Sequence, residues 1–112
     1  ENRRLAMPAS LDGGITSGLQ EDILTHATPA AAKALAILDN VETVLAIELT
    51  AAAQAHDLQS SNAAKAAMTQ RIYERVRHAV PFYRDDRPLN GDIQQIRTLL
   101  KTTAAWSESK GA

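Results

Sequence analysis

The pattern of apolar and polar positions predicts one long helix over residues 29–58. Thr28 followed by Pro29 is typical of a helix start, and neither proline nor glycine appears again until Pro81. Large apolar side chains recur every three or four residues along this stretch, as in one face of a helix. They are Leu35, Leu38, Val41, Leu45 and Leu49.

This predicted helix is too long and too apolar for the rest of the chain to cover. Between residues 41 and 55 it is apolar most of the way round, which is typical of a helix buried on several sides. At about 1.5 Å per residue it extends about 45 Å, longer than a small domain is wide. We therefore expect partner helices from a larger protein or from other subunits, and the run Ala51-Ala52-Ala53 allows them to approach closely.

A second, amphipathic helix is predicted to begin near Ser61 or Asn62, either of which can cap it. It ends near Val80, because Pro81 cannot continue a helix. We expect the charged residues of this helix, Arg77 among them, to lie on its solvent-facing side. Its apolar side consists of Met68, Ile72, Val76 and Ala79.

A third helix is predicted over about residues 91–100, with Asn90 as its cap. Its apolar side consists of Ile93, Ile96, Leu99 and Leu100. Prolines and glycines interrupt residues 1–28, which predicts irregular chain, and the small polar residues 103–112 predict a disordered tail. The expected fold class is all-α, with one long buried helix and two shorter ones in a helical region over residues 29–102.

Composition narrows the class of protein. Alanine accounts for 21 of the 112 residues and only four are aromatic, so large apolar side chains are scarce and a core built from this chain alone is thin. The net charge of −1 argues against nucleic acid or an anionic membrane as partner. No apolar run is long enough to span a bilayer, and the absence of cysteine favours a cytoplasmic setting. Because the chain begins without methionine, we expect a fragment of a larger protein.

Single residues give weak signals for chemistry. The three histidines are too far apart in sequence for a local ligand pair, so we expect no metal site. For His56, near the end of the long helix, we favour a surface or capping role. Glu48 interrupts an apolar run and needs a donor or a cation, and a salt bridge to a residue outside this chain is favoured over catalysis.

Residues 16–22 are a polar segment just before the long helix, and they have two interpretations. Gln20 with Glu21 and Asp22 could bind an ammonium group or move a proton. Alternatively, the acidic pair Glu21 and Asp22 favours the start of a helix, and the residues alone support this simpler interpretation.

Three stretches of the sequence resemble the carboxyl-terminal part of the aromatic amino acid ammonia-lyases. They are ENRRLAMPASLDGGITSGLQED, VETVLAIELTAAAQAHDLQ and VPFYRDDRPLNGDI. The resemblance covers residues 1 to about 100, and it is strongest to the histidine-specific members. It implies an all-helical homotetramer with a central bundle of long helices, which in histidine catabolism eliminates ammonia from L-histidine to give urocanate.

The resemblance also implies a prosthetic group and site residues. The family forms an electrophilic methylidene-imidazolone (MIO) from an internal Ala-Ser-Gly, whereas here Pro8-Ala9-Ser10 continues with Leu11. A chain without that tripeptide should be inactive alone. By position, Glu21 would be catalytic and place or accept a proton, Gln20 would bind substrate or the prosthetic group, and Thr16 would line the substrate pocket.

Two departures from the histidine-specific pattern keep other activities open. Ile23 stands where those enzymes usually have histidine, and His26-Ala27-Thr28-Pro29 replaces their run of small residues and methionine. A tyrosine or phenylalanine ammonia-lyase and an MIO-dependent aminomutase therefore remain alternatives. A hypothesis from another class is a non-catalytic helical module that recruits partners through the long helix.

Overall fold

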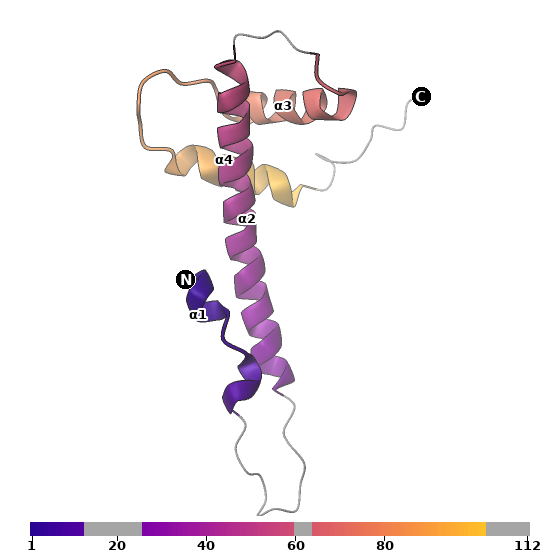
Figure 1. Cartoon of the computed structure of the whole chain (residues 1–112), viewed down its shortest axis with the longest axis vertical. Helices are drawn as coiled ribbons and strands as arrows, with labels where there is room; N and C mark the ends of the chain where they lie inside the picture. The colour runs from indigo at the N-terminus through magenta and orange to yellow at the C-terminus, as the bar shows by residue number, and fades with distance from the viewer. Residues whose placement is uncertain (13–25, 60–63, 103–112) are drawn as a thin grey trace, which may run out of the picture. The chain divides into compact units, whose positions relative to one another are not determined.

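The computed structural model describes residues 1–12, 26–59 and 64–102, and within these ranges the chain is helical with no strand (Figure 1). This confirms the predicted all-α class. The elements are α1 (Asn2–Leu5), the 3-10 turn η1 (Ala9–Asp12), α2 (Ala27–Asp57), α3 (Ala67–Ala79) and α4 (Asn90–Lys101). The chain separates into two compact units, Glu1–Val41 and Glu42–Ala112, and the division falls within α2.

The long helix α2 confirms the main prediction from the sequence. It begins two residues earlier than expected, because the His26 carbonyl already accepts the Ala30 N–H at 3.0 Å. Pro29 therefore lies inside the first turn, where a missing N–H costs nothing because these donors have no acceptor within the helix. At the other end, the Leu58 N–H still reaches the Gln54 carbonyl at 3.2 Å, and the helix ends at Asp57.

The amino-terminal unit contains two short turns where proline and glycine predicted irregular chain. The first, α1, begins after Glu1, whose carboxylate pairs with the Arg4 guanidinium at 2.5 Å. This exposed pair lowers the pKa of Glu1 below its ordinary value, mainly through the hydrogen bond from Arg4. Asn40 of α2 donates to the Asn2 side chain at 3.0 Å, which ties α1 to the first half of α2.

The core of the second unit is formed where α2, α3 and α4 meet. Its buried residues are Ala46, Ala53, Val76, Val80 and Ile96, with parts of Leu49, Ile72, Leu99 and Leu100 packed around them. Two of the five are alanines, so the core is thin, as the composition predicted. The buried Thr50 hydroxyl donates to the Ala46 carbonyl at 2.8 Å, which satisfies a polar group inside this apolar contact.

The start of α3 was predicted incorrectly. Residues 64–66 are not helical, and α3 begins at Ala67 instead of near residue 61, with an extended backbone at Ala66. The Lys65 amine lies 4.2 Å from the centre of the Tyr73 ring and donates to Gln70 at 3.1 Å. These contacts of Lys65 are made with the backbone extended at Ala66, and they offset the helix propensity of the alanine-rich sequence.

The cap of α4 was also predicted incorrectly, although its extent and apolar side are confirmed. Asn90 is the first helical residue, and Leu89 precedes the helix without a capping side chain. Asp92 in the first turn is buried instead and pairs with Arg87 at 2.5 Å. A carboxylate at this end of a helix is stabilised by the exposed N–H groups.

Within this chain, α2 buries one face only. Ala46, Thr50 and Ala53 are its buried residues. Its large apolar side chains elsewhere are 40–69% exposed, and they include Leu35, Leu38, Val41, Val44, Leu45 and Ile47. The chain alone therefore leaves the helix uncovered, as its length indicated, and the expected covering helices remain a prediction.

Candidate functional site

The residues that the sequence singled out for catalysis and substrate binding are Thr16, Gln20 and Glu21, and all three lie outside the described residues. The predicted tail at residues 103–112 lies outside them as well. The site described below is therefore a different one, built entirely within the second unit.

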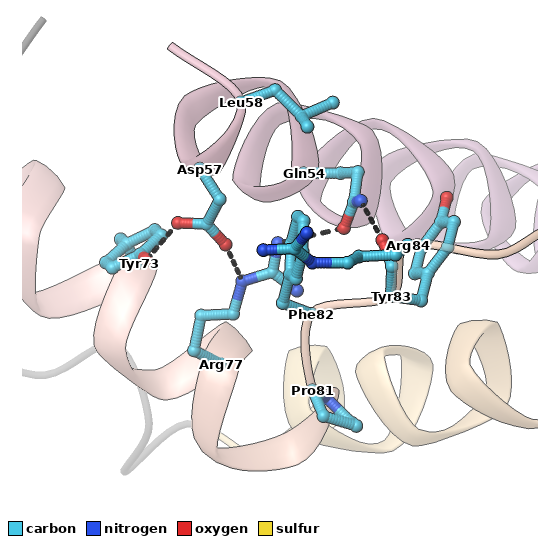
Figure 2. Close-up of a pocket in the computed structure, with 9 residues that line it drawn as sticks. All are labelled: Gln54, Asp57, Leu58, Tyr73, Arg77, Pro81, Phe82, Tyr83 and Arg84. Atoms are coloured by element: carbon cyan, nitrogen blue, oxygen red, sulfur yellow. Dashed lines mark hydrogen bonds and ion pairs between the residues drawn. The ribbon is translucent and has the colours of Figure 1, made fainter. Parts of the chain in front are cut away.

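An open pocket lies beside the end of α2, between α3 and the connection that follows it (Figure 2). It has a volume of about 1150 Å³. We call it the Arg77 pocket, and it is lined by Gln54, Asp57, Leu58, Tyr73, Arg77, Pro81, Phe82, Tyr83 and Arg84. The last turn of α2 supplies Gln54 and Asp57 three residues apart, so both project from one side of the helix.

Asp57 is held by two partners on α3. The Tyr73 hydroxyl donates to Asp57 Oδ1, and Arg77 Nε pairs with Asp57 Oδ2 at 2.7 Å (Figure 2). The two donors are four residues apart and so lie on the same side of α3. The side chains of Asp57 and Arg77 are only 19% and 13% exposed, which makes this pair stronger than an ordinary surface ion pair.

Gln54 extends the same network to the connection after α3. Its amide donates to the Tyr83 carbonyl at 2.6 Å and accepts from Arg77 NH2 at 3.2 Å. Arg77 NH1 donates in turn to the Val80 carbonyl at 3.3 Å. The guanidinium therefore links the end of α2, the end of α3 and the connection through all three of its nitrogens.

The carboxylate of Asp57 also changes the acidity of its neighbour. The hydrogen bond to Asp57 raises the pKa of the Tyr73 hydroxyl above its ordinary value, and burial and the negative charge act in the same direction. Tyr73 is therefore a neutral donor at physiological pH, and the network is one of orientation rather than proton transfer.

The connection after α3 is fastened at its far end by Arg87. Its guanidinium lies 5.3 Å from the centre of the Tyr83 ring and pairs with Asp92 of α4. Between the two attachments, Arg84, Asp85 and Asp86 are exposed. Four of the residues that line the pocket, Pro81 to Arg84, thus come from a connection that is attached at both ends.

Two candidate residues from the sequence lie outside this pocket. His56 is half-buried, with its ring edge-on to Tyr73 at 5.1 Å between centres. It lies in the last turn of α2, as predicted, and borders a separate apolar cavity of about 220 Å³ between α2 and α3. Glu48 is exposed in this chain, and the salt bridge expected for it stays a prediction.

A family model described as aromatic amino acid lyase matches residues 1–78, more than half of the chain. The chain belongs to the aromatic amino acid lyase family.

Individual lyases of this family are similar over almost the whole chain. The histidine ammonia-lyase of Natranaerobius thermophilus is 44% identical over 100 residues, which is 89% of this chain and 20% of that protein. The tyrosine ammonia-lyase of Cupriavidus metallidurans is 34% identical over 112 residues, which is 100% of this chain and 21% of that protein.

The fold agrees with a solved member of the family. The crystal structure of histidine ammonia-lyase from Trypanosoma cruzi matches with a TM-score of 0.81 and 34% identity, covering 94% of this chain and 20% of that one. The chain therefore spans about one fifth of the length of the lyases it matches.

No cluster of three histidine or acidic side chains able to hold a metal ion is found in the described part of this lyase-family chain, residues 1–12, 26–59 and 64–102. In the same ranges no helix is long and apolar enough to cross a membrane.

The sequence did not reveal the Arg77 pocket. Arg77 was expected on the solvent-facing side of its helix, and this was wrong because its guanidinium is drawn inward by Asp57 and Gln54. The available signal was a pair of spacings: Gln54 and Asp57 three apart, and Tyr73 and Arg77 four apart. Such spacings place polar groups on one helix face, but the pairing between helices depends on how α3 crosses α2.

Proposed function

We propose that residues 1–112 form a carboxyl-terminal part of an ammonia-lyase that converts L-histidine into urocanate and ammonia. The family match over residues 1–78, with a relative named histidine ammonia-lyase at 44% identity, carries this proposal. In such an elimination the Cα–N bond breaks, a proton leaves Cβ, and a double bond forms between the two carbons.

In this proposal the chain supplies three side chains to a site completed by other segments. Glu21 would hold the substrate ammonium group or accept a proton, because a carboxylate suits both tasks. Gln20 would donate or accept a hydrogen bond at the substrate, and Thr16 would line the pocket. These roles rest on the resemblance of residues 16–22 to the family pattern.

The family's prosthetic group, MIO, supplies an electrophile to this chemistry when present. It would have to come from other segments, because these 112 residues contain no Ala-Ser-Gly. The residues of this chain that would face it lie outside the described ranges.

The second candidate substrate is tyrosine. The relative from Cupriavidus metallidurans is named a tyrosine ammonia-lyase and matches the whole chain at 34% identity. Ile23, at a position where the histidine-specific pattern has histidine, keeps the same alternative open. Phenylalanine elimination and amino-group migration are the further outcomes that an assay must separate.

Assays of the full-length protein with histidine, tyrosine and phenylalanine, each tested separately, identify the substrate. We expect ammonia release with histidine, accompanied by the absorbance of urocanate. Elimination from tyrosine or phenylalanine alone would transfer the assignment to that substrate, and a β-amino acid product would identify an aminomutase. A gene whose reading frame holds no upstream Ala-Ser-Gly would instead support the non-catalytic helical module.

We predict that Glu21→Gln in the full-length protein lowers turnover by about 100-fold or more, because a positioned carboxylate is replaced by a neutral amide. The melting temperature should be nearly unchanged. Glu74→Gln is the matched control, since it makes the same change on the exposed surface of α3 and should leave turnover as it is. If Glu21→Gln lost stability and activity together, Glu21 would be structural.

A further inference from the structure

The Arg77 pocket has more positive than negative charge in its wall. Two guanidiniums, those of Arg77 and Arg84, face a single carboxylate, that of Asp57. Both oxygens of Asp57 already have partners, since Oδ1 accepts a hydrogen bond from Tyr73 and Oδ2 pairs with Arg77. Asp85 and Asp86 follow Arg84 in the chain but are exposed and do not line the pocket.

The two arginines differ in what they can still bind. Each nitrogen of the Arg77 guanidinium already lies within 3.3 Å of a carboxylate, carbonyl or amide oxygen of the chain, so Arg77 mainly shapes the wall and adds positive potential. Arg84 has no ion pair, hydrogen bond or ring contact with the part of the chain that the structure describes. Its side chain nevertheless runs back along the pocket toward Gln54 (Figure 2).

The remaining wall is apolar and contains a flat ring. Phe82 is 38% exposed at the pocket, and the Arg77 guanidinium carbon lies 5.9 Å from the centre of its ring. Pro81 and the 67% exposed Leu58 complete this side. A flat apolar group can therefore lie against Phe82 while an attached anion meets a guanidinium.

We propose that the Arg77 pocket binds a small carboxylate that carries a flat apolar group. The fork of Arg84 would take the carboxylate through two parallel hydrogen bonds, as guanidinium groups commonly do. Phe82 would contact the apolar group. Arg77, held by Asp57 and Gln54, would keep the wall fixed, so that little order is lost when the ligand binds.

The binding is tested by calorimetric titration of the full-length protein with three probes. Benzoate has both the anion and the flat ring, benzamide has the same shape without charge, and inorganic phosphate has the charge without the ring. We expect benzoate to bind about tenfold more tightly than either of the others, because each of those lacks one of the two contacts.

Variants locate the benzoate site. Arg84→Ala should remove one benzoate site per chain, and Arg84→Lys should weaken it about tenfold because the two-pronged contact is lost. Phe82→Ala should weaken benzoate several-fold while leaving phosphate unchanged. Arg71→Ala is the matched control, since it removes a guanidinium from α3 that does not line the pocket. A melting temperature for each variant reports whether it is folded.

A catalytic site for aromatic amino acids would also bind benzoate, and the number of sites separates the two cases. If both proposals hold, the wild type binds two benzoates per chain and Arg84→Ala binds one. If only the pocket proposal holds, the number of benzoates bound per chain falls from one in the wild type to none in Arg84→Ala. Equal benzoate binding by Arg84→Ala and the wild type would overturn the pocket proposal, whichever substrate the enzyme uses.

Discussion

At the residue scale, Tyr73 uses its hydroxyl and its ring for different kinds of contact. Its hydroxyl donates to Asp57 in the Arg77 pocket, while its ring contacts His56 and Lys65. The hydroxyl is therefore part of a polar network, and the ring takes part in an aromatic contact and a cation–π contact. Removing the oxygen alone separates these two contributions.

We predict that Tyr73→Phe destabilises the second unit by about 1–2 kcal/mol at neutral pH, because Asp57 loses a donor in a half-buried position. The pKa of Tyr73 is raised in the folded chain above its ordinary value of about 10. The native protein therefore keeps this stabilisation below about pH 10 and loses it as the pH rises through the raised pKa.

Chemical unfolding between about pH 9 and pH 11 measures this difference. The wild type should lose more stability across that range than Tyr73→Phe does. Tyr83→Phe is the control, since it removes the other tyrosine hydroxyl of this unit and keeps the bond to Asp57. Parallel curves for the wild type and Tyr73→Phe would contradict the prediction.

At the element scale, Arg77 connects α2, α3 and the segment that leads to α4. We predict that Arg77→Ala costs about 2–3 kcal/mol in unfolding free energy, because Asp57 is left half-buried without its cation. Arg77→Lys should recover only part of this loss, since one amine cannot reach Asp57, Gln54 and the Val80 carbonyl together.

Equilibrium denaturation of these variants beside Arg71→Ala checks the prediction. The control removes the same charge from α3 outside the network and should change stability by less than about 0.5 kcal/mol. If Arg77→Ala were as stable as the control, the ion pair with Asp57 would contribute nothing, as many surface pairs do.

The helices themselves could largely be predicted from the sequence. The three-and-four spacing of apolar residues identified α2 and α4 to within two residues, because this periodicity extends over many positions. Their ends were less predictable. Asn90 looked like a cap and Ser61 like a helix start, yet Asp92 with Arg87 and Lys65 with Tyr73 decided the local backbone. Such contacts join residues that only the fold brings together.

At the scale of the whole molecule, the uncovered apolar side chains of α2 are the dominant feature. Leu35 is 69% exposed, Leu38 is 58% exposed and Leu45 is 42% exposed. Exposed apolar surface of this extent usually marks an interface. It supports the expectation, drawn from the resemblance, that α2 joins a bundle of long helices.

We predict that the 112-residue chain self-associates in dilute solution through this part of α2. Leu45→Glu should shift sedimentation toward the monomer, because it places a charge in the apolar contact. Gln94→Glu on the exposed side of α4 adds the same charge elsewhere and should not change the mass distribution. A wild-type chain that sediments as a folded monomer would refute the prediction.

The sequence predicted the class of protein better than the site described here. The resemblance rested on local runs such as Gln20-Glu21-Asp22, which can be compared residue by residue without a structure. The Arg77 pocket joins Gln54 to Tyr83 and Asp57 to Arg77, positions that are distant in sequence and individually ordinary. The candidate catalytic residues stay a prediction, because they lie outside the described ranges.

The connection between α3 and α4 contains residues that anchor it to the helices and residues that make no such contacts with the described part of the chain and should tolerate insertions. Val80 and Tyr83 offer their carbonyls to Arg77 and Gln54, and Arg87 spans from the Tyr83 ring to α4. Asp85 and Asp86 stand exposed between these attachments. Insertions there would lengthen a surface tip at small entropic cost. New sequence can therefore be acquired at this tip without rebuilding the fold.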